Sequence, residues 1–125
     1  MKVLVIDTEK LQPQIVETPG GLEEWDRLIG CRLITISYFD IAGKRYDIIS
    51  DDEALLKQGG KVTAIDPEHN PLLVGNLVIC NYDGDGGEAG LTDQDIKSIT
   101  ENIVVLTEAQ AENPKKWLAL SNVTP

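Results

Sequence analysis

The sequence predicts a single small α+β domain with a mixed or antiparallel sheet and two or three short helices. Residues 72–82 form a nearly continuous apolar run, which is typical of a strand covered on both faces. Residues 92–102 begin with a capping residue and then repeat isoleucine at helical spacing. The other apolar segments are short and separated by turn residues, and 125 residues suit one core.

The first segments predict a hairpin followed by a helix. Residues 2–7 and 14–17 are rich in β-branched residues, and the loop between them is short enough to pair them as antiparallel strands. Residues 22–29 place Trp25 and other apolar side chains at helical spacing, and Gly30 then ends the helix.

A second hairpin is expected from the next segment. Residues 32–39 alternate in the manner of a strand, Ala42-Gly43-Lys44 supplies a turn, and residues 45–49 return as the partner strand. Leu33 and Ile36 are predicted to belong to the core.

The segment from 72 to 102 carries the strongest local signals. Residues 72–82 are predicted to form one central strand, with a bulge or a close backbone approach at Gly75. Thr92 is a good N-cap for the following helix, and Asp95 stands at the position of a capping box. The β-branched residues 103–106 then predict an edge strand.

We expect residues 1–106 to form the core domain and residues 107–125 to be a C-terminal extension, either docked or flexible. A third short helix, if present, lies at residues 51–57 or 108–112.

The chain is strongly acidic, with 21 acidic and 11 basic residues and a formal net charge of −10. Such a chain is repelled by nucleic-acid backbones and by anionic membranes, so direct binding to either is not expected. No apolar run approaches the ~20 residues of a membrane span. Cys31 and Cys80 are isolated and are expected to be reduced, which favours a cytoplasmic protein.

The acidic residues are unevenly placed, because no Lys or Arg occurs between Lys61 and Lys97. Loop solvation and helix-dipole complementation explain such a pattern in many proteins. The functional interpretation is a negative face that binds a basic partner. Its expected members are Asp66, Glu68, Asp83, Asp85, Glu88, Asp93 and Asp95.

A second group of residues suits a nucleotide ligand, because aromatic rings stack on bases and basic groups pair with phosphates. Its members lie on or beside the second hairpin, and a homodimer or higher oligomer could complete the pocket. They are Arg32, Tyr38, Lys44, Arg45 and Tyr46.

No catalytic motif is present, and neither a metal ion nor a cofactor is expected. Residues 81–86 resemble the start of an EF-hand loop, but Thr92 occupies the position of the bidentate glutamate. The alternative of a small metal-dependent enzyme would use the only histidine, His69, with acidic neighbours. Those neighbours would be Asp66, Asp83 and Asp85.

Several short segments resemble an uncharacterised family of short acidic bacterial proteins that is common in phages and other mobile elements. The likeness covers roughly residues 1–103. It is carried by Met1 to Ile6, by Gly21-Leu22-Glu23-Glu24 and Leu28-Ile29-Gly30, by Asn70-Pro71, and by Gly75 to Ile79 followed by Leu91-Thr92-Asp93. The resemblance supplies no catalytic residues. It implies an accessory gene of a mobile element, where small proteins often counter host defences.

Together these observations predict a non-catalytic binding protein in the bacterial cytoplasm. The first hypothesis is sequestration of a basic host protein through the acidic face, in the manner of a DNA mimic. The alternatives are a sponge for a cyclic or modified nucleotide that signals immunity, and the metal-dependent enzyme.

Overall fold

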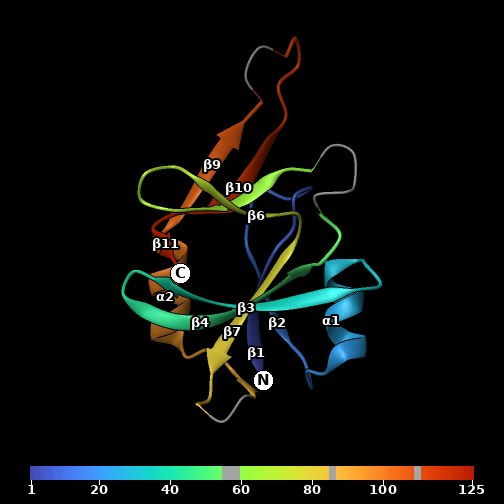
Figure 1. Ribbon diagram of the computed structural model, residues 1–125, viewed down its shortest axis with the longest axis vertical. Helices are drawn as coiled ribbons and strands as arrows, with labels where there is room; N and C mark the ends of the chain where they lie inside the picture. The colour runs from blue at the N-terminus through green and yellow to red at the C-terminus, as the bar shows by residue number, and fades with distance from the viewer. Residues whose placement is uncertain (55–59, 85–86, 109–110) are drawn as a thin grey trace.

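The computed structural model describes residues 1–54, 60–84, 87–108 and 111–125. Two sheets and two helices form the described part of the chain (Figure 1), which confirms the predicted α+β class, although strands predominate. Sheet A contains seven strands in the order β11-β3-β4-β7-β1-β2, with β8 paired to β7. Sheet B contains four, in the order β6-β5-β10-β9.

The strands of sheet A pair antiparallel throughout. Their bounds are β1 Lys2–Ile6, β2 Gln14–Glu17, β3 Ile34–Ile41, β4 Lys44–Asp51, β7 Leu77–Tyr82, β8 Glu88–Ala89 and β11 Val123–Thr124. Both predicted hairpins are confirmed, since β1 pairs with β2 and β3 pairs with β4.

Sheet B is mixed, because β10 pairs parallel with β5 and antiparallel with β9. Its strands are β5 Val62–Ile65, β6 Pro71–Val74, β9 Ile103–Thr107 and β10 Lys116–Leu120. β9 is an edge strand, as predicted. Residues 116–124 are built into both sheets, with Trp117, Leu118 and Val123 buried.

Each face of sheet A has its own core. Helix α1 (Leu22–Ile29) packs Trp25 and Ile29 on one face, and helix α2 (Asp93–Glu101) and sheet B cover the opposite face. Figure 1 shows the two helices on opposite sides of the sheet. Most residues on both faces of the central strands are therefore covered by an apolar layer, and Asp47 and Ser50 of β4 are the buried polar exceptions among the described residues of these strands.

Both helices begin and end where the sequence indicates. α1 ends at Gly30, which adopts a left-handed conformation with φ 82°. α2 begins after Thr92, whose Oγ1 accepts from the Asp95 backbone N–H while the Asp95 carboxylate accepts from the Thr92 N–H. This capping box confirms the predicted helix start.

The predicted central strand 72–82 is wrong as a single element. The chain leaves sheet B after β6 and enters sheet A at β7, and Gly75 makes the turn with φ 86°. Asn76 holds this crossing in place, because its side chain accepts from the Thr8 N–H and donates to the Ile29 carbonyl. Residues that read as a bulge are therefore the link between two sheets.

Leu33 was predicted in the core but is 55% exposed, because β3 begins only at Ile34. The candidates for a third helix at 51–57 and 108–112 include residues 55–59 and 109–110, which lie outside the described residues, and β4 itself continues to Asp51.

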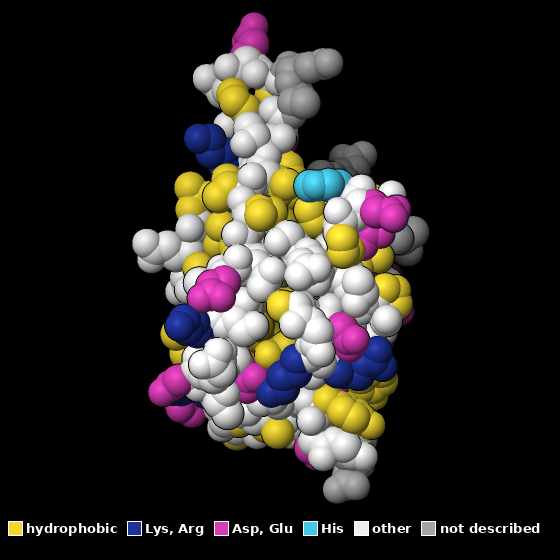
Figure 2. All heavy atoms as spheres, turned by 90° about the vertical axis from the view of Figure 1, so that its left-hand side faces the viewer, with side chains coloured by type: hydrophobic (Ala, Val, Ile, Leu, Met, Phe, Trp, Pro, Cys, Tyr) yellow, Lys and Arg dark blue, Asp and Glu magenta, His cyan; other side chains and the backbone are white. Residues whose placement is uncertain are grey.

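An apolar patch lies on the surface below the tip of the molecule (Figure 2). Figure 2 shows hydrophobic side chains gathered there, while charged side chains of both signs lie lower on the same side. In β9, Val104 and Val105 are exposed. A hollow of ≈ 310 Å³ between β9, β10 and the β5–β6 turn is lined by Leu106, Trp117 and His69, among others.

Candidate functional site

The residues predicted to form one acidic face lie in three separate places. Asp66 and Glu68 lie in the turn that joins β5 to β6, whereas Asp83 and Glu88 lie at the β7–β8 end of sheet A, at the bottom of Figure 1. Asp93 and Asp95 belong to the first turn of α2. Asp85 lies outside the described residues.

Asp66 has a local structural role. Its carboxylate accepts from the Glu68 N–H, the Asn70 N–H and the Asn70 side chain at 2.8–3.0 Å. These bonds, first of all those from Asn70, lower the pKa of Asp66. The carboxylate therefore shapes the turn.

Asp95 is also committed to structure. It is 4% exposed, and its carboxylate accepts from Lys44 Nζ at 2.5 Å, Tyr46 OH at 3.0 Å and Asn81 Nδ2 at 2.7 Å. The Thr92 N–H and hydroxyl add two bonds at 2.9 Å. Burial alone would raise the pKa of Asp95, but the bonds from Lys44, Thr92 and Asn81 outweigh it and hold that pKa well below its ordinary range.

This network removes two residues from the predicted nucleotide group. Tyr46 is fully buried, and burial followed by its bond to Asp95 raises its pKa strongly. Lys44 lies over the Tyr46 ring at 5.3 Å and pairs with Asp95. Tyr38 and Arg45 belong to the opposite face of sheet A, and Arg32 lies in the turn after α1, so the five residues do not meet.

The part of sheet A that α1 leaves uncovered presents a different cluster. Tyr38 of β3, Asp47 of β4 and Cys80 of β7 stand side by side in register, and Tyr82 pairs with Glu88 of β8. The rings of Tyr38 and Tyr82 meet edge to face with centroids 5.5 Å apart. We call Tyr38, Asp47, Tyr82, Asp83 and Glu88 the tyrosine–carboxylate face.

Asp47 lies beside the two tyrosine rings. Tyr38 is directly opposite Asp47 in the register, and Tyr82 lies two residues beyond Cys80, the β7 partner of Asp47. The rings come from the strands on either side of β4 and contact each other across it, on the face that carries Asp47. Asp47 is only 2% exposed, while Tyr38 and Tyr82 are 47% and 42% exposed.

The electrostatics of Asp47 are unusual. Its Oδ1 is buried and has no hydrogen-bond partner among the described residues. Burial, then the charge of Glu88, then that of Asp83 raise the pKa of Asp47 from 3.8 to about 6. Leaving a buried polar atom unsatisfied costs about 1–3 kcal/mol, so this arrangement opposes folding when the group is charged.

The neighbouring groups make this face negative. Arg45, which lies at its rim, donates from Nε to Asp40 at 3.0 Å. Burial, then Asp47, then Glu88 raise the pKa of the Cys80 thiol to about 12. That thiol stays protonated at neutral pH and is a poor nucleophile.

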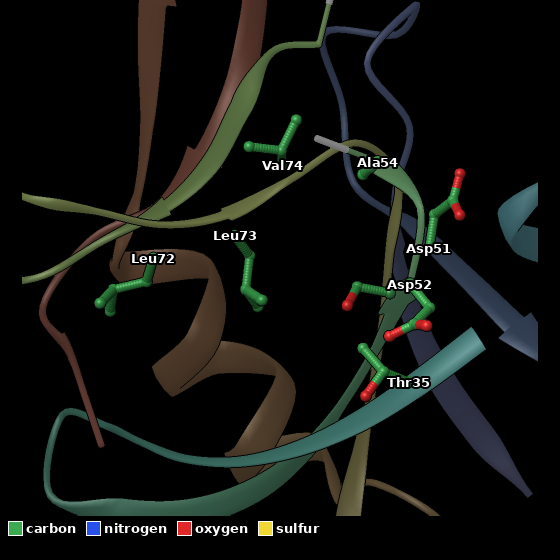
Figure 3. A pocket seen from close by; sticks show the side chains of 8 residues that line it. Thr35, Asp51, Asp52, Ala54, Leu72, Leu73 and Val74 are labelled. Atoms are coloured by element: carbon green, nitrogen blue, oxygen red, sulfur yellow. The ribbon is translucent and has the colours of Figure 1, made fainter. Parts of the chain in front are cut away.

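Further hollows lie away from this face. One, of ≈ 170 Å³, separates the β3–β4 end from β6. Figure 3 shows Thr35 and Asp52 on one side of it and Leu73 on the other, with the Asp51 carboxylate directed away. A second hollow, of ≈ 290 Å³, is lined by Thr8, Glu9, Leu11 and three lysines, Lys61, Lys115 and Lys116. Lys61 Nζ lies 3.7 Å from Glu9 Oε1 there.

The metal-dependent alternative gains no geometric support from the residues described. His69 adopts φ 68° in the β5–β6 turn beside Asp66, away from Asp83. Across residues 1–54, 60–84, 87–108 and 111–125, no three Asp, Glu, His or Cys side chains are grouped as metal ligands would be. The Asp83 carboxylate accepts from the Gly87 N–H at 3.0 Å within its turn.

Sequence reasoning missed Asp47 and Tyr82 as site residues. The available signal was a single carboxylate at an inward position of the β4 sequence, next to Ile48 and Ile49. Charged residues are almost never fully buried without a partner.

Comparison with known proteins gives one match. The family model DUF3846, described as a domain of unknown function, matches residues 1–104. No curated protein and no solved structure matches the chain. Neither helix of the described chain is long and apolar enough to cross a membrane. The chain therefore belongs to DUF3846, a family of domains of unknown function.

Proposed function

We propose that this chain is a non-catalytic binding protein that sequesters a basic protein through the tyrosine–carboxylate face. In the setting that the sequence resemblance implies, it is an accessory protein of a phage or mobile element, acts in the bacterial cytoplasm, and counters a host defence. The observation that carries the proposal is a pair of nearly half-exposed tyrosines on the same face as a buried carboxylate, with two more carboxylates close enough to raise its pKa.

The chemistry of this face suits cationic side chains. Aromatic rings attract Arg and Lys through their faces, and tyrosine is enriched at protein interfaces. Glu88 and Asp83 add negative potential, and the net charge of −10 steers basic molecules at long range. The proposal therefore keeps Asp83 and Glu88 from the predicted acidic face and replaces its other described members with Tyr38, Tyr82 and Asp47.

Co-purification from the native host tests the proposal. The tagged wild type is compared with the double variant Asp83→Asn, Glu88→Gln, and captured proteins are identified by mass spectrometry. The matched control is Glu68→Gln, Glu101→Gln, which removes the same charge from exposed positions away from the face.

We expect a basic protein to be captured by the wild type and by the control, and to be depleted with the face variant. The face variant should slow association more than it speeds dissociation, and added salt should shrink the difference. Equal capture by all three proteins would contradict the proposal. Equal loss from both variants would show that net charge alone matters.

The nucleotide sponge remains a second candidate because of the hollow with three lysines. A phosphate-bearing ligand would bind there and not beside Asp47, where carboxylates repel it. Small molecules released from the purified protein by heat identify such a ligand by mass spectrometry. Their binding should then depend on Lys61 and Lys116 and be unaffected by Asp83→Asn, Glu88→Gln.

A further inference from the structure

The tyrosine–carboxylate face contains an unfilled bonding position. Asp47 Oδ1 is the one buried side-chain oxygen or nitrogen without a hydrogen-bond partner in the part of the chain that the structure describes. Asp47 is only 2% exposed, and it lies directly opposite Tyr38 on the face of sheet A where the Tyr38 and Tyr82 rings meet. Native proteins satisfy nearly all such atoms, so an exception calls for an explanation.

None of the described groups around Asp47 can fill that position with a positive charge. β3 contributes Tyr38, and β7 contributes the protonated Cys80 and Tyr82. Among the described residues at the β7–β8 end, the charged groups that act on Asp47 are the carboxylates of Asp83 and Glu88. On β4 itself, Arg45 bonds to Asp40.

We propose that Asp47 is the receptor for one guanidinium group, an arginine side chain of the basic partner, which inserts beside the Tyr38 and Tyr82 rings. This inference rests on the proposed function and specifies its contact. A single carboxylate flanked by two aromatic rings offers a charge partner and π faces together. A guanidinium is planar, weakly hydrated and able to donate to a carboxylate while stacking on rings, which an ammonium does less well.

The tyrosines permit entry because neither ring is locked in the core. Both are nearly half exposed, and their contact with each other is edge to face. A guanidinium entering between them would exchange a ring–ring contact for two ring–cation contacts and would neutralise Asp47. Glu88 and Asp83 would stabilise the same cation from the side.

Binding should depend on pH in a defined way. Since the pKa of Asp47 is raised to about 6, the free protein carries a proton there at lower pH, and an entering cation must displace it. Between pH 7.5 and pH 5.0 the dissociation constant should therefore rise about tenfold, which is the linkage expected for one group of this pKa.

The test uses three blocked peptides of alternating glycine and one second residue: arginine, lysine, or citrulline as the neutral isostere of arginine. Binding is followed by NMR through the Asp47 carboxyl carbon and the Tyr38 and Tyr82 ring signals. The proteins are the wild type, Asp47→Asn, and Glu68→Gln as the matched surface control.

We expect the arginine peptide to shift all three signals of the wild type and of the control. It should bind more tightly than the lysine peptide, and the citrulline peptide should not bind. Asp47→Asn should weaken arginine binding at pH 7.5 about tenfold or more and should abolish its pH dependence.

Two results would overturn the inference. Equal binding of the arginine peptide by wild type and Asp47→Asn would show that the cation binds elsewhere. Equal affinity for the lysine and arginine peptides would show that the site does not select a guanidinium. The proposed function is tested separately. It would be rejected only if capture of host proteins did not change in the Asp83→Asn, Glu88→Gln variant. A partner captured through Asp83 and Glu88 with no response at Asp47 would keep the function and reject this contact.

Discussion

Asp95 and Asp47 are two buried aspartates on opposite faces of one sheet, and they have opposite electrostatics. Asp95 receives five hydrogen bonds, one of them from a lysine, and its pKa is lowered. Asp47 has an oxygen without a described partner, and its pKa is raised to about 6. Burial is nearly equal in the two, so the partners decide the sign.

The two aspartates differ in the bonding capacity that each has left for a ligand. A carboxylate that collects donors stabilises the fold and has no bonding capacity left for a ligand. A carboxylate buried without donors opposes folding, and strain of this kind concentrates at binding sites. Asp95 was predicted from the sequence as a binding residue, and its geometry makes it the hub that joins α2 to sheet A.

The largest expected effect is the loss of the Asp95 network. Asp95→Ala should destabilise the protein by about 3 kcal/mol, because it leaves the buried Tyr46 hydroxyl and the Thr92 N–H without their acceptor. Chemical denaturation measures the change. The control is Asp93→Ala, at an exposed position in the same helical turn, which should reduce the free energy of unfolding far less. Equal losses in the two variants would show that the Asp95 network contributes no special stability.

The second effect has the opposite sign. Asp47→Asn should stabilise the protein at pH 7.5 by on the order of 2–3 kcal/mol, since the rise of the Asp47 pKa from 3.8 to about 6 costs 1.36 kcal/mol per pKa unit and the asparagine carries no charge. Because the pKa of Asp47 is higher in the folded protein than in the unfolded chain, protonation of Asp47 stabilises the fold. This stabilisation is complete below pH 3.8, the unfolded pKa, and is lost as the pH rises through about 6.

The advantage of Asp47→Asn should therefore shrink between pH 7 and pH 4 and disappear below pH 4. Thermal or urea denaturation at several pH values measures it. Asp95 has the reverse dependence, because its lowered pKa gives stability above 3.8 that is lost as the pH falls. A constant difference across this range would mean that folding does not raise the pKa of Asp47.

A smaller loss is expected at the helix cap. Thr92→Ala should cost about 1 kcal/mol, the usual value for an N-cap oxygen. Thr92 also donates to Asp95, so Thr92→Ser should restore most of the stability. A denaturation midpoint that does not change in Thr92→Ala would show that the Lys44, Tyr46 and Asn81 bonds suffice to hold Asp95.

The smallest expected effect is that of chelation. If Asp47 binds a guanidinium group and not a metal ion, EDTA should leave the melting temperature unchanged. The comparison condition is added calcium, which should also have no effect. A fall of more than about 10 °C with EDTA would show that a bound ion contributes a large share of the stability.

Local sequence determined the elements that local chemistry can specify. α1 with its Gly30 end, α2 with its Thr92–Asp95 box, and the β3–β4 hairpin all follow from spacing, caps and turns within about ten residues. The family resemblance also came from short segments of sequence, and the family match covers residues 1–104.

Tertiary structure decided what depends on distant partners. Gly75 reads as a bulge or as a turn with equal ease, and only the presence of two sheets makes it the link between β6 and β7. Asp47 and Asp95 are the same residue type in ordinary sequence surroundings. Their pKa values shift in opposite directions because Lys44, Tyr46 and Asn81 donate to Asp95, whereas two tyrosine rings and two carboxylates lie near Asp47. Strand register, and not the neighbours in the chain, brings these groups together.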